Sequence, residues 1–325
     1  MNITFCIPLF NDWSSAAVLL TRLDESVSAL RAAAKGANVC VPFVDDASSE
    51  REDRAQFTRP VSIDRVSILR LKRNLSHQRA IAVGLAHLQE QGQSDLVVVM
   101  DGDGEDRPSD VPAMLQRCIQ SDCSLIVFAA RAKRSESGAF LLGYACYRAA
   151  HRILVGRAIR VGNFSVIPRA YLDRLTSVSE LWNHYAAAVL ASGIPNCQIP
   201  IDRGKRIAGS SKMNLVSLVV HGLSAISVHG ELVSVRVLFL LGLLCGLLFV
   251  GLVLVVCIRV GTDLAIPGWA TSAFGFLVLA LLQLLMTSVV MAILVLRGRS
   301  GLGFIPSRDY VHFVQAEEPL FKELS

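Results

Sequence analysis

No CxxC pair and no zinc-type spacing of cysteine and histidine occur in this sequence of 325 residues, although it contains eight cysteines. Scattered thiols of this kind are typical of a reducing, cytosolic compartment. The first residues also lack the basic region and the long apolar region of a signal peptide. We therefore expect the part of the chain before its first long apolar stretch to stay in the cytoplasm.

Charged residues are absent from two long stretches, residues 237–258 and 270–296. An α-helix needs about 20 apolar residues to cross a bilayer, so both stretches are long enough to span it. A buried core helix is the alternative, and these lengths disfavour it. Because the whole chain is 52% hydrophobic, it differs from an ordinary soluble protein, and we expect a two-helix transmembrane hairpin.

The arginines near the two stretches predict an orientation. Those at the outer ends are Arg236, Arg297, Arg299 and Arg308, whereas the connection has Arg259 beside Asp263. Basic residues favour the cytoplasmic side, so both termini are expected in the cytoplasm and the connection outside, in an inner or plasma membrane. The net charge of +5 is mild. It suits a membrane surface or an anionic ligand equally, and we predict no nucleic-acid partner.

The first 230 residues alternate short apolar runs with helical stretches. The runs are 3–9, 39–44, 66–71, 96–100 and 124–130, and the helical stretches are 14–34, 76–91, 108–121 and 140–157. This alternation predicts an α/β fold with a mostly parallel sheet covered on both faces. Ligands of such sheets bind at the carboxyl ends of the strands, where this sequence places "FND", "DDASS", "RNLSHQ" and "DGDGED".

The segment "VVVMDGDGEDRP" places four carboxylates directly after an apolar run. In an extended segment Asp101, Asp103 and Glu105 point the same way, and the glycines between them allow close backbone approach. Carboxylate oxygens suit Mg²⁺ or Mn²⁺, and Mg²⁺ commonly combines one or two carboxylates with ligand phosphates. The segment therefore predicts a metal and diphosphate site, with an ordinary solvated turn as the alternative.

The other polar clusters fit a nucleotide pocket, and each also has a structural alternative. Asp45 and Asp46 can accept from ribose hydroxyls or base N–H groups, or Asp45 can brace its turn through Ser48. Phe10 and Asp12 can form a wall with one acceptor, or pack and cap the next helix. In "RNLSHQ", Ser76 can be a helix cap, and a histidine there is more often structural than catalytic.

In their order along the chain, "IPLFND", "VDDASS", "LKRNLSHQRAIAVGL", "MDGDGEDRP" and "RIAGSSKM" resemble motifs of the inverting family 2 glycosyltransferases that load a sugar onto a polyprenyl phosphate. Dolichol-phosphate mannose synthases and bacterial undecaprenyl-phosphate glycosyltransferases are of this type. The resemblance covers residues 2–299. It implies a GT-A-type, Rossmann-like catalytic domain (1–213), an interfacial helix (214–231), a transmembrane hairpin (232–299) and a cytoplasmic tail (300–325).

The resemblance also implies roles for individual residues. The nucleotide sugar, UDP- or GDP-linked, is expected to bind Pro8, Phe10, Asp12, Val44, Asp46, Asp101, Gly102 and Asp103. The metal, Mg²⁺ or Mn²⁺, is expected on Asp101, Asp103 and Glu105. Catalysis is expected from Asp101, Asp103, Arg206 and Lys212, and binding of the acceptor phosphate from Arg131, Arg134 and Arg148. The basic residues near 206 can instead attract anionic lipid headgroups, and the helix at 214–231 can be a buried domain helix.

One departure from the pattern concerns the chemistry directly. Many bacterial relatives have aspartate where "GNFSVIPR" has Asn163, so no conventional catalytic base is predicted. A phosphate monoester is largely ionised near pH 7 and can attack without one. We expect single displacement with inversion at the cytoplasmic face. The alternatives are a different lipid or polysaccharide acceptor, a membrane nucleotidyltransferase and an inactive nucleotide-sugar-binding scaffold. The oligomeric state is open, and a homo-oligomer is compatible with the sequence.

Overall fold

The structure, a computed structural model, describes residues 1–33, 36–131, 155–156, 161–202, 204, 206–207, 215–262, 268–300 and 303–321. The chain divides into two compact units. The larger lies within residues 1–145, 159–228 and 303–325, and the smaller within 146–158 and 229–302. Most of the helix expected at 140–157, together with Arg134, Arg148 and Lys212, lies outside the described residues.

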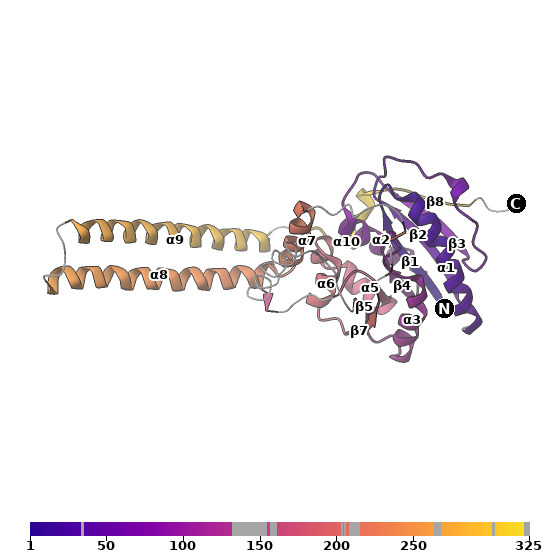
Figure 1. The fold of residues 1–325 in the computed structure, drawn as a ribbon, viewed down its shortest axis with the longest axis horizontal. Helices are drawn as coiled ribbons and strands as arrows, with labels where there is room; N and C mark the ends of the chain where they lie inside the picture. Colours follow the sequence, from indigo (N-terminus) through magenta and orange to yellow (C-terminus); the bar gives the residue numbers. More distant parts are fainter. Residues whose placement is uncertain are drawn as a thin grey trace. The chain divides into compact units, whose positions relative to one another are not determined.

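The larger unit is built on one mixed sheet (Figure 1), to which its described residues contribute eight strands in the order β7-β5-β6-β4-β1-β2-β3-β8. The strands are β1 (Asn2–Leu9), β2 (Asn38–Asp45), β3 (Arg65–Leu71), β4 (Leu96–Val99), β5 (Ile126–Arg131), β6 (Ser165–Pro168), β7 (Asn196–Ile201) and β8 (Val314–Pro319). Pairing is parallel from β3 through β2 and β1 to β4, and between β5 and β7. β6 and β8 pair antiparallel with their neighbours. The predicted α/β class with a mostly parallel sheet is confirmed.

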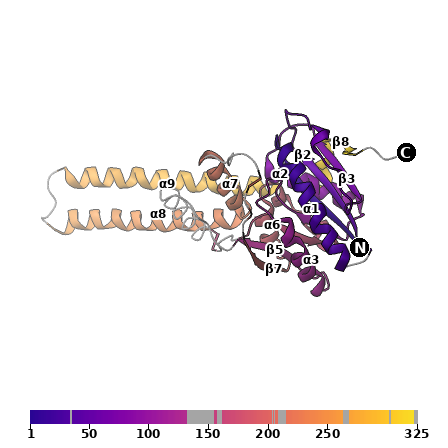
Figure 2. The ribbon, with the colours of Figure 1, turned by 45° about the vertical axis from the view of Figure 1, so that its right-hand side comes forward.

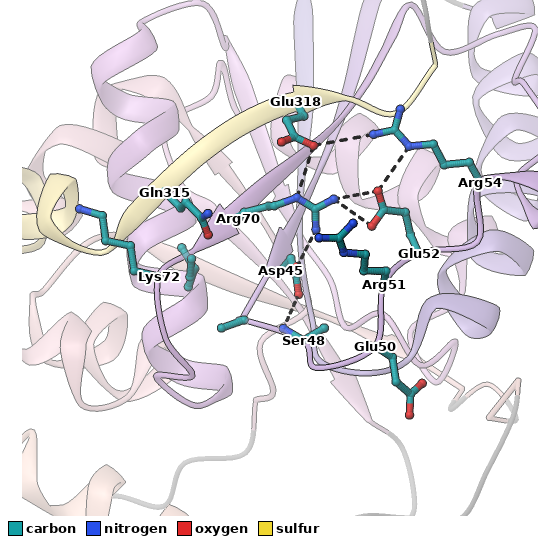
Figure 3. A pocket seen from close by; sticks show the side chains of 12 residues that line it. Asp45, Ser48, Glu50, Arg51, Glu52, Arg54, Arg70, Lys72, Gln315 and Glu318 are labelled. Atoms are coloured by element: carbon teal, nitrogen blue, oxygen red, sulfur yellow. Dashed lines mark hydrogen bonds and ion pairs between the residues drawn. The ribbon is translucent and has the colours of Figure 1, made fainter.

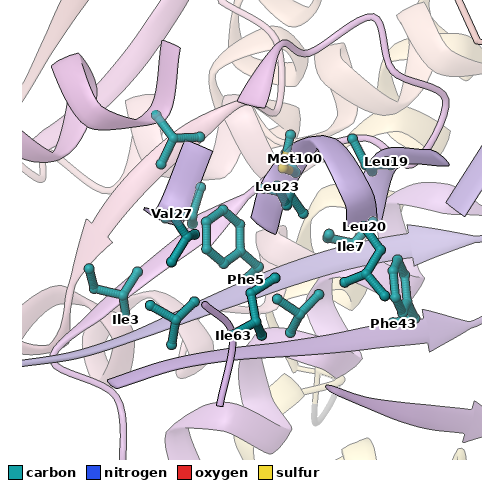
Figure 4. Packing of buried hydrophobic residues seen from close by; sticks show 14 of the residues in the cluster. Ile3, Phe5, Ile7, Leu19, Leu20, Leu23, Val27, Phe43, Ile63 and Met100 are labelled. Carbon is teal, nitrogen blue, oxygen red and sulfur yellow. The ribbon is translucent and has the colours of Figure 1, made fainter. Parts of the chain in front are cut away.

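Helices cover both faces of this sheet. The described helices of the larger unit are α1 (Trp13–Ala33), α2 (His77–Gln91), α3 (Val111–Gln120), α5 (Arg169–Thr176), α6 (Tyr185–Ala191), α7 (Leu215–Ser227) and α10 (Pro306–Asp309), with short 3-10 turns at Arg54–Gln56, Pro108–Asp110, Ser179–Trp182 and Tyr310–His312. Figure 4 shows Phe5 of β1 and Phe43 of β2 packed with Leu20 and other residues of α1. On the opposite face Cys6 packs with residues of α2. Both faces are buried, which explains why the central strands read as uninterrupted apolar runs.

The end of the chain adds a strand that the sequence analysis did not predict. Residues 300–325 were expected to form a tail, whereas β8 pairs antiparallel with β3 at the edge of the sheet. Three aromatic rings, Trp182, Phe304 and Phe313, pack together beside it. The buried side chain of Leu320 follows the strand. The C-terminal segment is therefore part of the larger unit.

The smaller unit contains two long apolar helices, α8 (Gly230–Gly261) and α9 (Trp269–Ser300), which lie side by side (Figures 1 and 2). A methyl group on Gly251 would lie 3.7 Å from the side chain of Leu277, so the two helices are in close contact there. Most of their large apolar side chains are exposed, Phe239 and Phe276 among them. Within the described residues, these are the two helices long and apolar enough to cross a membrane. They match the predicted hairpin in length and composition.

Candidate active site

The loops that follow β1 and β2 are tied together by one side chain, Asn11. Its backbone N–H donates to Oγ of Ser48 (2.9 Å), its Nδ2 donates to Oγ of Ser49 (2.9 Å), and its Oδ1 accepts from the N–H of Glu50 (3.1 Å). Asn11 has φ 48°, and Ala47 in the facing loop has φ 56°. Such left-handed backbone is strained for residues other than glycine and clusters at functional sites. The carboxyl ends of β1 and β2 therefore form one rigid rim.

Asp45 and Asp46 at the end of β2 are both buried, each 3% exposed, and both support loops. Asp45 accepts from the N–H of Ser48 (2.9 Å) and pairs with Arg70 (3.2 Å), which is the bracing role left open by the sequence. Asp46 accepts from the N–H groups of Leu75 (2.6 Å) and Ser76 (2.9 Å). Burial raises the pKa of Asp46 to about 6, against the effect of these two donors. Asp46 thereby holds the loop that enters α2.

A cavity of about 630 Å³ opens beside this rim, where β2 and β3 end and β8 passes (Figure 3). Arg70 lies at its centre and is ion-paired with Asp45, Glu52 and Glu318. The remaining charged lining side chains are Glu50, Arg51, Arg54 and Lys72. Acidic and basic side chains balance in this lining, so the cavity suits a polar, weakly charged group better than a phosphate.

The acidic loop begins where β4 ends, and its backbone is held from inside. The buried carboxylate of Asp106 accepts from the N–H of Asp101 (2.9 Å), and Asp103 accepts from the N–H of Glu105 (3.0 Å). A methyl on Gly102 would lie 3.2 Å from the carbonyl oxygen of Pro8, so this loop and the end of β1 nearly touch. Asp101 and Asp103 are thus fixed next to the rim of β1 and β2.

A second segment docks on the acidic loop through backbone contacts. The N–H of Gly204 donates to the carbonyl of Glu105 (2.8 Å), and the N–H of Ile207 donates to the carbonyl of Asp103 (3.0 Å). A methyl on Gly204 would lie 2.7 Å from the carbonyl oxygen of Gly104. On the side of the acidic loop, a methyl on Gly104 would lie 2.4 Å from the side chain of Ile207 in the docked segment. This mutual fit requires glycine at both positions.

The docked segment brings Arg206 to the acidic loop. Its Nη2 atom lies 3.5 Å from Oδ2 of Asp103. Its buried Nε atom has no hydrogen-bond partner among the residues that the structure describes. A buried donor without a partner is costly, and an anion placed beside it would relieve that cost. Arg206, which the resemblance places at the donor diphosphate, thus lies beside the acidic loop.

Among the described residues, His77 and Asn163 contact Asp101 from other elements. His77 at the start of α2 places Nε2 at 3.0 Å from Oδ1 of Asp101, and Nδ2 of Asn163 lies 3.4 Å from the same oxygen. Partial desolvation lowers the pKa of His77, but the Asp101 carboxylate outweighs it and raises the pKa above its usual value. The sequence favoured a structural histidine, and the structure places this one at the acidic loop.

The acidic loop offers oxygen donors of the type that Mg²⁺ and Mn²⁺ prefer. Burial, followed by the charges of Asp101 and Glu105, raises the pKa of Asp103, so a cation here would relieve repulsion. Within the part of the chain that the structure describes, no three His, Cys, Asp or Glu side chains are grouped closely enough to hold a metal ion. The donor set fits a metal held by Asp101 and Asp103 and completed by ligand phosphates.

The remaining predicted residues are spread over the rim and beneath it. Phe10 is 41% exposed and offers a ring face at the end of β1. Pro8 and Val44 are buried, and Val44 packs against Gly84 of α2. Asp12 precedes α1, and its carbonyl accepts from the N–H of Ala16 (3.1 Å). The backbone of Arg131 ends β5.

Two supporting residues at the site, Asp106 and Gly204, were not expected from the sequence. Asp106 was one carboxylate in a run of four, and only its burial distinguishes its role. Gly204 and Gly104 are 100 positions apart, so their contact leaves no local pattern. The spacing "GDGED" and the glycine two residues before Arg206 were the signals available in the sequence.

The sequence model of Glycosyl transferase family 2 matches residues 4–176, a little over half of the chain. The uncharacterized glycosyltransferase YkcC of Bacillus subtilis is 25% identical over 257 residues, which is 78% of this chain and 75% of that protein. The undecaprenyl-phosphate 4-deoxy-4-formamido-L-arabinose transferase of Edwardsiella ictaluri is 25% identical over 236 residues. That alignment spans 67% of this chain and 64% of the transferase.

Among solved structures, glucosyl-3-phosphoglycerate synthase from Mycobacterium tuberculosis is similar at 15% sequence identity and a TM-score of 0.43. The similarity covers 72% of this chain and 79% of that one.

Proposed function

The chain belongs to glycosyl transferase family 2, and we propose that it transfers a sugar from a nucleoside-diphosphate sugar to a polyprenyl phosphate with inversion at the anomeric carbon. The donor is UDP- or GDP-linked, and the product is a polyprenyl-phosphate sugar. The relative from Edwardsiella ictaluri, whose name states an undecaprenyl-phosphate acceptor, supports the choice of acceptor.

The observation that carries this proposal is the pairing of Arg206 with Asp103. A cation and two carboxylates at one loop suit a diphosphate that leaves with increased negative charge. Arg206 lies 3.5 Å from Asp103, and its buried Nε still lacks a partner among the described residues, so it is placed to donate to a phosphate oxygen. Phe10 and the cavity beside Asp45 lie at the same rim and can receive the nucleoside.

Asp101 and Asp103 would hold Mg²⁺ or Mn²⁺, which supplies positive charge to the diphosphate when it is bound. Glu105 is proposed to add a carboxylate at the rim. Arg206 and Lys212 are proposed to bind the departing diphosphate, and Arg131, Arg134 and Arg148 the acceptor phosphate. Pro8, Phe10, Asp12, Val44 and Asp46 are proposed to form or support the nucleotide side.

No general base is required in this reaction because the acceptor phosphate is already ionised near pH 7. The neutral side chain of Asn163 agrees with that, since it cannot take a proton from an acceptor. The chain's own task is to bind both substrates, to orient the phosphate behind the anomeric carbon and to keep the leaving group neutralised.

The apolar exteriors of α8 and α9 support a membrane location for the acceptor. Exposed apolar surface of this length is unfavourable in water, and a lipid-linked acceptor requires the enzyme at the bilayer. We propose that both helices span the membrane, with the catalytic unit and both termini on the cytoplasmic side. α7 exposes Val220 (56%) and Leu223 (59%), while its Ala225 and the following Val228 are buried, and it is proposed to lie at the membrane interface.

A substrate panel tests the proposed function. The purified chain is given UDP- and GDP-sugars with undecaprenyl or dolichyl phosphate, and the lipid product is weighed by mass spectrometry. A mass increase of one sugar on the lipid phosphate is expected for at least one combination. Sugar transfer to water or to a glycan in place of the lipid would favour another acceptor. Absence of turnover under every condition would favour a binding scaffold.

A further inference from the structure

Asn163 lies at the centre of a chain of hydrogen bonds that starts at the buried residue Tyr185 and ends at the acidic loop. The backbone N–H of Tyr185 donates to Oε1 of Gln78 (2.7 Å), and Nε2 of Gln78 donates to Oδ1 of Asn163 (3.1 Å). Nδ2 of Asn163 then lies 3.0 Å from Nε2 of His77 and 3.4 Å from Oδ1 of Asp101. We call these contacts the amide chain.

The direction of the amide chain is set by its first member. A backbone N–H can only donate, so Gln78 must turn its oxygen toward Tyr185 and its NH₂ group toward Asn163. Asn163 must then accept with its oxygen, which leaves its NH₂ group to donate to Oδ1 of Asp101. Nε2 of His77 is a neighbour of this group and itself donates to the same carboxylate when protonated. Tyr185 is fully buried and Gln78 is 9% exposed, so water competes little for these bonds.

A second connection from Tyr185 holds the backbone of Asn163. Oγ of Ser165 donates to the carbonyl oxygen of Asn163 (2.9 Å) and lies 2.6 Å from the phenol oxygen of Tyr185. Because the hydroxyl proton of Ser165 is used toward Asn163, the phenol is the donor in that contact. Asn163 is thus fixed through both its side chain and its main chain.

We propose that Asn163 is a positioning residue for Asp101, whose amide group the chain of hydrogen bonds from Tyr185 aims at that carboxylate. This role rests on the proposed function, in which Asp101 helps to hold the metal and the donor diphosphate. An aspartate at position 163 would accept from Gln78 equally well, but its second oxygen would face Asp101 at about the 3.4 Å that now separates donor and acceptor. Two carboxylates at that separation repel each other.

The substitution Gln78→Glu tests the direction of the amide chain without touching Asp101. One oxygen of the new carboxylate still accepts from Tyr185, but the other now needs a donor. Asn163 must therefore turn its amide over and place Oδ1 against Asp101. Asp101→Asn in the same chain restores a match, because its own amide can donate to that oxygen. Gln89→Glu is the control, since it adds the same charge to the same helix and loses a contact with Asp173.

Thermal unfolding of the full chain in detergent measures this coupling without any substrate. Gln78→Glu is expected to lower Tm by several degrees, since a lost buried hydrogen bond shifts Tm by about 2–4 °C or more in a unit of this size. The double variant Gln78→Glu/Asp101→Asn is expected to recover at least half of that loss. The proposal would be overturned if the Tm changes of Gln78→Glu and Asp101→Asn simply added in the double variant. It would also be overturned if Gln78→Glu were as stable as Gln89→Glu.

Turnover separates this inference from the proposed function. Gln78→Glu is expected to raise the Mn²⁺ concentration for half-maximal lipid glycosylation about tenfold and to change the KM for polyprenyl phosphate less than twofold. If the Tm effects of Gln78→Glu and Asp101→Asn are coupled but the unchanged protein shows no turnover, the amide chain is supported and the proposed function is contradicted. Normal metal dependence in an active Gln78→Glu variant would overturn the positioning role.

Discussion

Nη2 of Arg206 lies 3.5 Å from Oδ2 of Asp103, although the two residues belong to segments about a hundred positions apart. The contact depends on two backbone hydrogen bonds and on two glycines, Gly204 packed against the carbonyl oxygen of Gly104 and Gly104 packed against the side chain of Ile207. Positive and negative charge are therefore brought together by the backbone, and the side chains only complete the contact. Several tests follow from this dependence and from the supports around it.

Gly204→Ala is expected to lower turnover at least about tenfold. Its methyl would lie 2.7 Å from the carbonyl oxygen of Gly104, so the segment must shift and carry Arg206 away from Asp103. Initial rates of lipid glycosylation by the purified variant measure the effect. Gly242→Ala is the control, because its methyl meets no atom within 4 Å and its backbone is helical within α8. Equal rates for the two variants would show that the docking of this segment is not needed.

Asp46→Asn is expected to lower the free energy of unfolding by about 1–3 kcal/mol. The carboxylate accepts from both Leu75 and Ser76, whereas an amide offers a single oxygen and turns its NH₂ group toward the other N–H, so one of the two hydrogen bonds is lost. Hydrogen exchange of the loop before α2 and thermal unfolding measure the change. Asp53→Asn, whose remaining oxygen can still accept from the exposed N–H of Ala55, should cost much less. A variant at position 46 as stable as the unchanged protein would contradict the bracing role.

The attachment of β8 is expected to weaken in acid. Glu317 lies 3.0 Å from Nε2 of His87 and accepts from the hydroxyl of Ser67 (2.7 Å). These contacts, chiefly the one with His87, lower the pKa of Glu317 from 4.5 to about 2. A lowered acid pKa stabilises the fold fully above about pH 4.5, and that contribution is lost as pH falls toward 2. The free energy of unfolding should therefore decline over this range by about 2–3 kcal/mol.

Glu317→Gln should remove most of that pH dependence. Unfolding followed by tryptophan fluorescence at a series of pH values measures both proteins, and their stabilities should converge near pH 2–3. The more exposed neighbour Glu318, changed to Gln, serves as the control. Parallel stability curves for the unchanged protein and Glu317→Gln would contradict the role of this carboxylate.

The two apolar helices predict integral membrane binding. The full chain reconstituted into phospholipid vesicles should float with them after a wash in alkaline carbonate and in about 1 M salt, which removes surface electrostatic attraction. If the protein is recovered in the wash, it binds the membrane only peripherally, and the proposed transmembrane hairpin is contradicted.

Sequence reasoning succeeded where the signal was local. The runs of β1 to β4 are apolar because both faces of the sheet are buried, and Asp101 follows its strand directly, so strand and acidic loop were placed together. The GT-A-type α/β class followed by two long apolar helices is confirmed by the sheet and by the family match. The role of Arg206 at the diphosphate was implied by the resemblance alone, and its contact with Asp103 was not predicted.

The missed features have long-range causes. β8 reads "VQAEEP", a polar sequence with no strand pattern, and it is a strand because Glu317 and its neighbours find partners about 250 positions earlier. The bonds of Asp46 to the loop before α2, and its burial, depend on where that loop folds back. The orientation of Asn163 depends on a backbone N–H of α6, which no spacing in the sequence encodes.

The most direct test of the central claim is the release of nucleoside diphosphate with and without polyprenyl phosphate. The unchanged protein with Mg²⁺ or Mn²⁺ should release it only when the lipid phosphate is present. Asp103→Ala should lose at least about a hundredfold in rate, while Asp173→Ala, an exposed carboxylate on α5, should stay close to the unchanged rate. Release that is independent of the lipid, or near-normal turnover by Asp103→Ala, would contradict the account.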